Sequence, residues 1–170
     1  LLAYHIVSQV GYMVVGIGIG TEMAVNGAVS HAFAHILYKA LLFMGAGAVI
    51  HVTGRRKLTE LGGLYKTMPV TLALYMVGAL AISAFPFFSG FVTKSMVVAA
   101  AGQDHRALVV LALTMASSGT FLHTGLKLPY YMFFGTDQGL EAREPPRNML
   151  VAMGMAAVLC IAIGVFPQTL

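Results

Sequence analysis

The sequence predicts an all-α protein, a polytopic transmembrane helix bundle of about five spans. Hydrophobic residues make up 58% of the 170 residues and charged residues only 9%, against roughly 25% charged residues in soluble domains. The apolar runs are continuous and long enough for helical crossings of about 20 residues, and they lack the period of two typical of barrel strands. The chain is therefore expected to lie in a lipid bilayer.

Five apolar segments are expected as spans, at residues 2–20, 28–52, 68–101, 106–134 and 147–166. The third is too long for one simple crossing. Pro86 removes a backbone donor, and Ser89 and Gly90 weaken the helix just after it. We therefore predict a broken helix near Phe85–Gly90, with Lys94 about one turn beyond the break.

The fourth segment is also too long for a simple crossing. Small and polar residues weaken its middle, and Pro129 follows Lys127 near its far end. A second helix distortion is expected there.

The charges of the connectors predict the orientation of the bundle. The connectors 53–67 and 135–147 carry six basic residues, whereas the opposite connectors carry one, Arg106. Because positive residues favour the cytoplasmic side, both basic connectors are expected to be cytoplasmic, in what we take to be a bacterial plasma membrane. The alternation of charge supports five crossings independently of hydropathy.

Composition argues against a nucleic-acid partner and excludes an intrachain disulfide. The net charge of +4 is spread over connectors and single intramembrane positions, so it forms no basic stripe for a nucleic acid. The single cysteine, Cys160, lies in an apolar run and is interpreted as a small buried residue. The chain starts without Met and ends without a polar tail, so we expect a fragment of a longer polytopic protein.

Three ionisable residues interrupt the second span at intervals of four, in HAFAHILYK. Four residues turn a helix by about 400°, so His31, His35 and Lys39 share one face. A central lysine in lipid costs several kcal/mol, so this face is expected to contact protein or water. Imidazole can accept a proton on one nitrogen and release one from the other near neutral pH. The pattern therefore indicates proton transfer at mid-membrane.

Other interpretations of this face remain open. A histidine can simply bond a neighbouring helix, and a lysine can extend to the membrane surface. Histidines four residues apart are also a familiar metal-ligand pair. A metal site would lack partners, because no Asp or Glu lies inside any span.

Four further residues are candidates for the same chemistry. Lys94 is the strongest of them because broken helices in membranes line cavities and ion paths. His123 and Lys127, again four apart, are candidate relay groups, as is His5, which together with Ser8 and Gln9 could extend the polar chain. Each of these three could also be only a helix contact or a group at the membrane surface.

The sequence resembles a known family in four stretches: LLAYHIVSQVGYM, HAFAHILYKALLFMGAG, ELGGLYKTMP and SAFPFFSGFVTK. It is similar to the antiporter-like, proton-translocating membrane subunits shared by respiratory complex I and the Mrp-type cation/proton antiporters, and GLKLPYYMFFG is typical of the D subunit of the Mrp type. The resemblance implies two inverted five-helix repeats in about fourteen helices. Residues 1–170 would be part of the second repeat plus the helices that follow it.

The resemblance also implies roles for single residues. Lys39 would belong to the central polar axis and Lys94 to the half-channel that opens to the other side. The paired glutamate and lysine of the first repeat have no counterpart in this chain. His5 stands where many relatives have Ser.

The function expected is proton translocation as one subunit of a multisubunit Na⁺ or K⁺/proton antiporter, with no catalytic site or cofactor of its own. Its partners would be other membrane subunits, protons, a monovalent cation and the lipid bilayer. The first alternative is a proton-pumping membrane subunit of an NADH:quinone oxidoreductase or related hydrogenase complex. The second is a structural, haem-binding or metal-binding membrane subunit.

Overall fold

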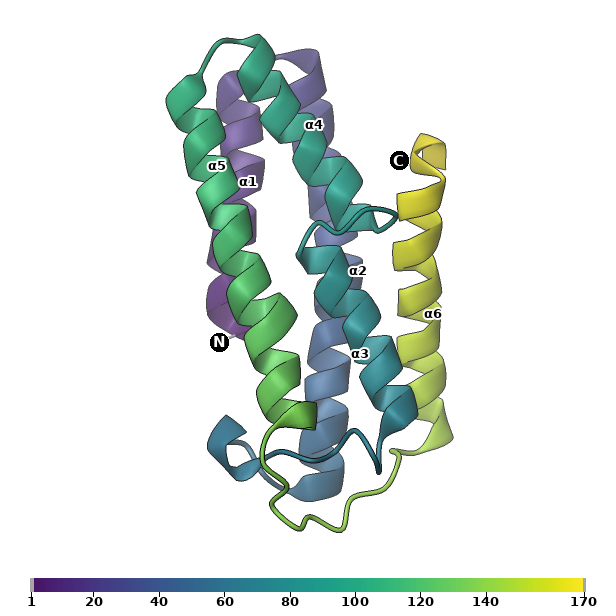
Figure 1. Cartoon of the computed structure of the whole chain (residues 1–170). Helices are drawn as coiled ribbons and strands as arrows, with labels where there is room; N and C mark the ends of the chain where they lie inside the picture. The colour runs from purple at the N-terminus through teal and green to yellow at the C-terminus, as the bar shows by residue number, and fades with distance from the viewer. Residues whose placement is uncertain (1, 170) are drawn as a thin grey trace.

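The structure, a computed structural model, describes residues 2–169 as an up-and-down bundle of helices (Figure 1). Its main helices are α1 Leu2–Ile19, α2 Glu22–Thr53, α3 Pro69–Ile82, α4 Ser89–Gln103, α5 Ala107–Thr120 and α6 Arg147–Val165. Short helical turns are η1 Leu58–Glu60, η2 Phe121–Lys127, η3 Tyr130–Phe134 and η4 Pro167–Thr169.

Four helical stretches within the described residues are long and apolar enough to cross a membrane: α1, α2, the run Ala107–Phe134 and α6. The helices α3 and α4 have 14 and 15 residues, or about 21 to 23 Å each, short of a hydrocarbon core of about 30 Å. They follow one another along the bundle and together make the fifth crossing (Figure 1). The predicted all-α integral membrane bundle is confirmed.

Helix α2 is the centre of the bundle and packs against α1, α3, α4 and α6. It starts six residues before the predicted segment, because the side chain of Thr21 accepts a hydrogen bond from the Ala24 amide and caps the first turn. Gly54, at φ 68°, ends the helix, with its amide bonded to the carbonyl of Ile50. Capping, which hydropathy does not register, therefore sets both ends.

The predicted break in the third segment lies between Ile82 and Ser89. Pro86 is inside it, while Ser89 and Gly90 are the first two residues of α4 rather than part of the break. Ala84 and Phe87 both adopt left-handed backbone angles, φ 58° and 70°, which non-glycine residues rarely do and which cost about 1 to 3 kcal/mol each. Surrounding packing must therefore hold this turn in place.

The second predicted distortion is present too. After Thr120 the helix widens into turns with hydrogen bonds to the fifth preceding residue, as from the Leu128 amide to the His123 carbonyl. Pro129, which has no N–H, stands between the two widened stretches η2 and η3.

Both basic connectors lie at one end of the bundle, where the chain between α2 and α3 meets the chain between η3 and α6 (Figure 1). Glu144 joins the second connector to the start of α3: its carboxylate accepts hydrogen bonds from the amide of Val70 at 2.6 Å and the hydroxyl of Thr71 at 2.6 Å. This carboxylate caps the first turn of α3 from a distant part of the chain.

Candidate functional site

The face of α2 that carries the three ionisable residues points into the interior of the bundle. The exposed fractions of His31, His35 and Lys39 are 0%, 7% and 5%. The predicted shared face is therefore a buried one, away from lipid. Helices α1 and α4 pack against α2 and supply the hydrogen-bond partners of His31.

His31 is the hub of a buried hydrogen-bond network. Its Nδ1 lies 2.8 Å from the hydroxyl of Thr93 on α4, and its Nε2 lies 3.2 Å from Oε1 of Gln9 on α1. The hydroxyl of Tyr38 donates to the same Gln9 oxygen at 3.1 Å. Nε2 of Gln9 in turn donates to the hydroxyl of Thr120 at 3.4 Å. One imidazole thus connects three helices.

The network fixes which nitrogen of His31 can accept a proton. Thr120 donates its own hydroxyl proton to the Ala116 carbonyl, so it accepts from Gln9 and leaves the amide oxygen of Gln9 pointing at His31. An amide oxygen only accepts, so with Gln9 in this orientation Nε2 of His31 carries the proton. The hydroxyl of Tyr38 lies 3.4 Å from Nε2 but donates to the Gln9 oxygen at 3.1 Å. Nδ1 is then the basic nitrogen, and it accepts from Thr93.

Thr93 can respond when Nδ1 takes up a proton. Its hydroxyl also lies 3.3 Å from the carbonyl of Ser89, one turn earlier in α4. A protonated Nδ1 donates to Thr93, and the hydroxyl then turns to the Ser89 carbonyl. Both protonation states of His31 are therefore satisfied without movement of the backbone.

Lys94, next along α4, is held by the broken helix. Its ammonium donates a 2.7 Å hydrogen bond to the carbonyl of Ile82, the last residue of α3, and its side chain is 3% exposed. The carbonyl end of a helix attracts a cation. The ammonium also lies 5.3 Å from the ring centre of Tyr12, close enough for a cation–π interaction. The break therefore supplies the backbone acceptor that a buried lysine needs.

Glycines allow other elements to approach the break closely. A Cβ on Gly90 would lie 1.9 Å from the carbonyl oxygen of Ala81 in α3. A Cβ on Gly164 of α6 would lie 2.2 Å from the carbonyl oxygen of Phe87. A larger residue at either position would clash with backbone, so α4 packs directly on the last turn of α3 and α6 packs directly on the strained turn.

Lys39 and His35 have a different environment. Nζ of Lys39 and Nε2 of His35 are buried and have no hydrogen-bond partner among residues 2–169. The ion pairs within this range, which join Arg55 and Lys57 to Glu60 and Arg106 to Asp104, all lie in connectors. A buried amine without a counter-charge is costly unless it is hydrated or paired from elsewhere.

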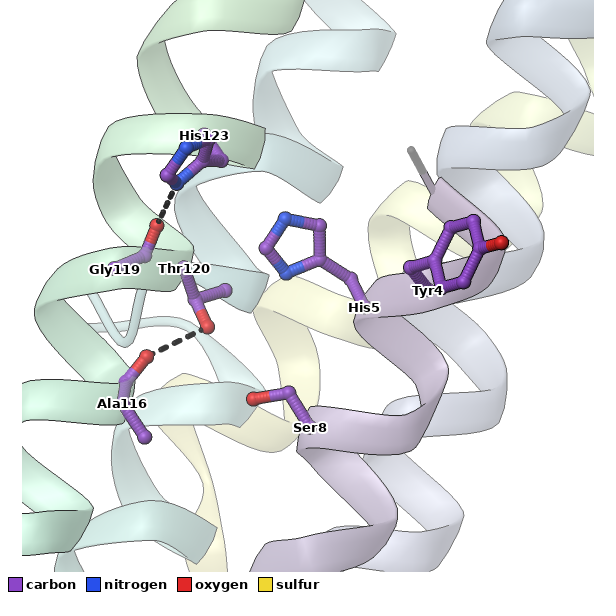
Figure 2. Close-up of a pocket in the computed structure, with 7 residues that line it drawn as sticks. All are labelled: Tyr4, His5, Ser8, Ala116, Gly119, Thr120 and His123. Carbon is purple, nitrogen blue, oxygen red and sulfur yellow. Dashed lines mark hydrogen bonds between the residues drawn. The ribbon is translucent and has the colours of Figure 1, made fainter.

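The remaining predicted residues lie apart from the hub. His123 is exposed and its Nδ1 donates to the Gly119 carbonyl at 2.9 Å. His5 is half-buried on α1, with its ring centre 6.0 Å from that of His123, and Figure 2 shows the two rings facing one another across a groove. Lys127 is exposed. Cys160 is buried in α6 as expected.

Sequence reasoning missed Thr93 and Tyr38. Both side chains are fully buried and bond to the hub. A signal for Thr93 was its place between Ser89 and Lys94, in the first turns after the break. Tyr38 has no comparable signal, because tyrosine is common in apolar segments.

Comparison with known proteins places the chain in a family. The family model for the transmembrane region of NADH:quinone oxidoreductases and Mrp antiporters matches residues 1–121. The chain is 37% identical over 141 residues to the D subunit of the Na⁺/H⁺ antiporter of Alkalihalophilus pseudofirmus, covering 83% of this chain and 28% of that protein. It is 32% identical over 187 residues to the L subunit of the F420H2 dehydrogenase of Methanosarcina mazei, covering 99% and 27% respectively.

Solved structures share the fold. A chain of the Mrp complex from Dietzia sp. superposes with a TM-score of 0.90 at 23% identity, over 99% of this chain and 40% of that one. A chain of the membrane-bound sulfane sulfur reductase, an archaeal respiratory membrane complex, gives 0.89 at 29% identity, over 95% and 27%. This chain thus spans well under half of these relatives. It belongs to the transmembrane family of NADH:quinone oxidoreductase and Mrp antiporter subunits.

Proposed function

We propose that the chain carries protons across the membrane as part of one subunit of a multisubunit Na⁺ or K⁺/proton antiporter. The observation that carries this proposal is the buried network around His31, which ends beside Lys94 at the broken helix. Residues 1–170 are part of the second inverted repeat plus the helices that follow it. The connectors 53–67 and 135–147 face the cytoplasm of a bacterial cell.

In this proposal His31 exchanges protons through its two nitrogens, and Lys94 holds a proton beside it. Thr93 precedes Lys94 in α4, and its hydroxyl contacts Nδ1 of His31. Lys39 and His35 continue the path along α2 toward the basic connectors. A proton on one amine raises the energy of a charge on a neighbouring one, so loading one site favours release from the next.

The partners and the transported ions follow from the proposed antiporter function. The other antiporter subunits provide the remaining helices, and outward movement of the cation is coupled to inward movement of protons. The Alkalihalophilus relative is a D subunit of such an antiporter, which supports the assignment. No cofactor or catalytic site is assigned to this chain.

A second candidate function is a proton-pumping subunit of a respiratory dehydrogenase or hydrogenase complex. The similarity to the L subunit of the F420H2 dehydrogenase favours it. The same residues would then move protons in response to electron transfer in other subunits. The neighbouring open reading frames distinguish the two, since small antiporter subunits indicate the Mrp type and quinone-reductase subunits indicate the respiratory type.

Substitution of Lys94 tests the proposal. Lys94→Ala in the full-length protein, in correctly assembled complexes, is expected to reduce proton-coupled transport in everted vesicles to background. Lys66→Ala, at an exposed lysine of the basic connector, is the matched control and should retain transport. Undiminished transport in Lys94→Ala would reject its role.

Lys39→Arg tests whether the amine must titrate, since arginine keeps the charge but does not release its proton. Loss of transport is expected, and a fully active variant would mean that charge alone suffices. A purely structural or haem-binding subunit predicts instead that Lys39→Met and Lys94→Met both retain transport.

A further inference from the structure

The histidine pair His5 and His123 lies outside the hub and has no role in the function proposed above. The two residues come from α1 and η2 and line a groove of about 600 Å³ together with Ser8, Gly119 and Thr120 (Figure 2). His5 lies fourteen residues before the end of α1 at Ile19, or about 21 Å along the helix. The pair is therefore at membrane depth, where polar side chains need partners.

The separation of the two rings fits an ion between them. Their centres are 6.0 Å apart and their planes are inclined by 45°. A direct N–H···N hydrogen bond and a shared zinc ion, with Zn–N bonds of about 2.0–2.1 Å, both bring ring centres to roughly 5 to 6 Å, so the present spacing lies close to that of a shared ion. A small rotation of either side chain is enough.

His123 is already arranged as a metal ligand. Its Nδ1–H donates to the Gly119 carbonyl at 2.9 Å, so its Nε2 carries the free lone pair. Metal-ligating histidines usually have this second hydrogen bond, which fixes the tautomer and the ring orientation. His31, by contrast, has both ring nitrogens hydrogen-bonded to protein groups. Neither nitrogen is therefore free to bind a metal ion.

We propose that His5 and His123 form a binding site for a borderline divalent transition-metal ion of the Zn²⁺ type. Imidazole is a preferred ligand of such ions. Groups of three or more His, Cys, Asp or Glu suited to a metal ion do not occur in residues 2–169, so the described residues supply two of the ligands. Two imidazoles are fewer than the four protein ligands of a structural zinc centre, so on their own they form a reversible site.

Occupation of the site would also affect proton transfer, a consequence that rests on the proposed function. Thr120 forms part of the groove wall and is the hydrogen-bond partner of Gln9, which leads to His31. A divalent ion beside Thr120 places two positive charges next to this path. Zinc is therefore expected to inhibit transport and a chelator to restore it.

The binding test uses the full-length protein in its purified complex. Zinc titrations against a chromogenic chelator compare wild type with His5→Gln and His123→Gln, with His105→Gln, an exposed histidine of the α4–α5 turn, as control. Each pair variant should lose one zinc equivalent, or bind it at least about tenfold more weakly. Equal stoichiometry and affinity in wild type and both pair variants would overturn the site.

Two additions keep the test decisive. The double variant His5→Gln and His123→Gln is expected to bind zinc about as weakly as either single variant, because loss of one imidazole already breaks the pair; losses that add up in assembled complexes would refute a shared ion. Zinc inhibition of transport is then measured in the same variants. Lost zinc binding with unchanged zinc inhibition supports the site and counts against the path through Thr120.

Discussion

The contact between Thr93 and His31 allows a sharp test of the hub. Thr93→Val replaces a hydroxyl by a methyl group of similar shape, at a position that is fully buried and in a helix where the two residues have similar propensity. The change therefore removes the 2.8 Å contact to Nδ1 of His31 and the 3.3 Å contact to the Ser89 carbonyl, and keeps the packing. Thr93→Ser keeps the hydroxyl and is the matched control.

The magnitude follows from the partners that remain. After Thr93→Val, Nδ1 of His31 has lost its hydroxyl, while Nε2 keeps Gln9. A single side-chain hydrogen bond in a membrane protein contributes about 0.6 kcal/mol on average and about 1.7 kcal/mol at most. We expect a loss of stability of about 1 kcal/mol, measured by unfolding of the purified complex in mixed micelles.

The effect on transport should be much larger than the effect on stability. If protons reach His31 through Nδ1, removal of the hydroxyl lowers the initial rate of transport in everted vesicles by about tenfold or more. Thr93→Ser should transport within about twofold of wild type. A wild-type rate in Thr93→Val, with assembly unchanged, would refute proton transfer to Nδ1 of His31 through Thr93.

The packing of the break and the connectors gives two further predictions. Gly164→Ala places a Cβ 2.2 Å from the Phe87 carbonyl oxygen and should destabilise the complex by about 1 to 3 kcal/mol, whereas Gly154→Ala, with open space at its Cβ, should be neutral or stabilising. Glu144→Ala removes the cap of α3 and should lower the stability by about 1 to 2 kcal/mol, whereas Glu141→Ala at an exposed site should change it little. The half-life of transport activity at raised temperature is measured for each variant and its control. Equal half-lives within a pair would contradict the corresponding contact.

The parts of the site that the sequence predicts are those that break a rule of membrane helices. His31, His35 and Lys39 stand out because ionisable side chains are rare in apolar segments, and Pro86 marks the break because it cannot donate a backbone hydrogen bond. Helix capping explains why the start of α2 was misplaced, since Thr21 caps a first turn that begins with a polar residue, Glu22, which hydropathy excludes.

The parts that the sequence does not predict depend on contacts between distant segments. Glu144 caps a helix that starts 75 residues earlier, at Pro69, and no local pattern indicates this. Thr93 acquires its role only when α4 packs on α2, and Tyr38 only when α1 does. The pairing of His5 with His123 likewise requires α1 and η2 to be neighbours.

The two strongest candidate groups are stabilised in different ways, and this difference has consequences for mutation. His31 lies on an unbroken helix whose own backbone is satisfied, so its partners are side chains and each can be deleted singly. Lys94 bonds a carbonyl freed by the break, and no side-chain substitution removes that acceptor. Disturbing it requires moving the end of α3, against which Gly90 packs, or the turn that follows, against which Gly164 packs. Sensitivity around His31 should therefore be spread over several helices, whereas sensitivity around Lys94 should concentrate at these two glycines.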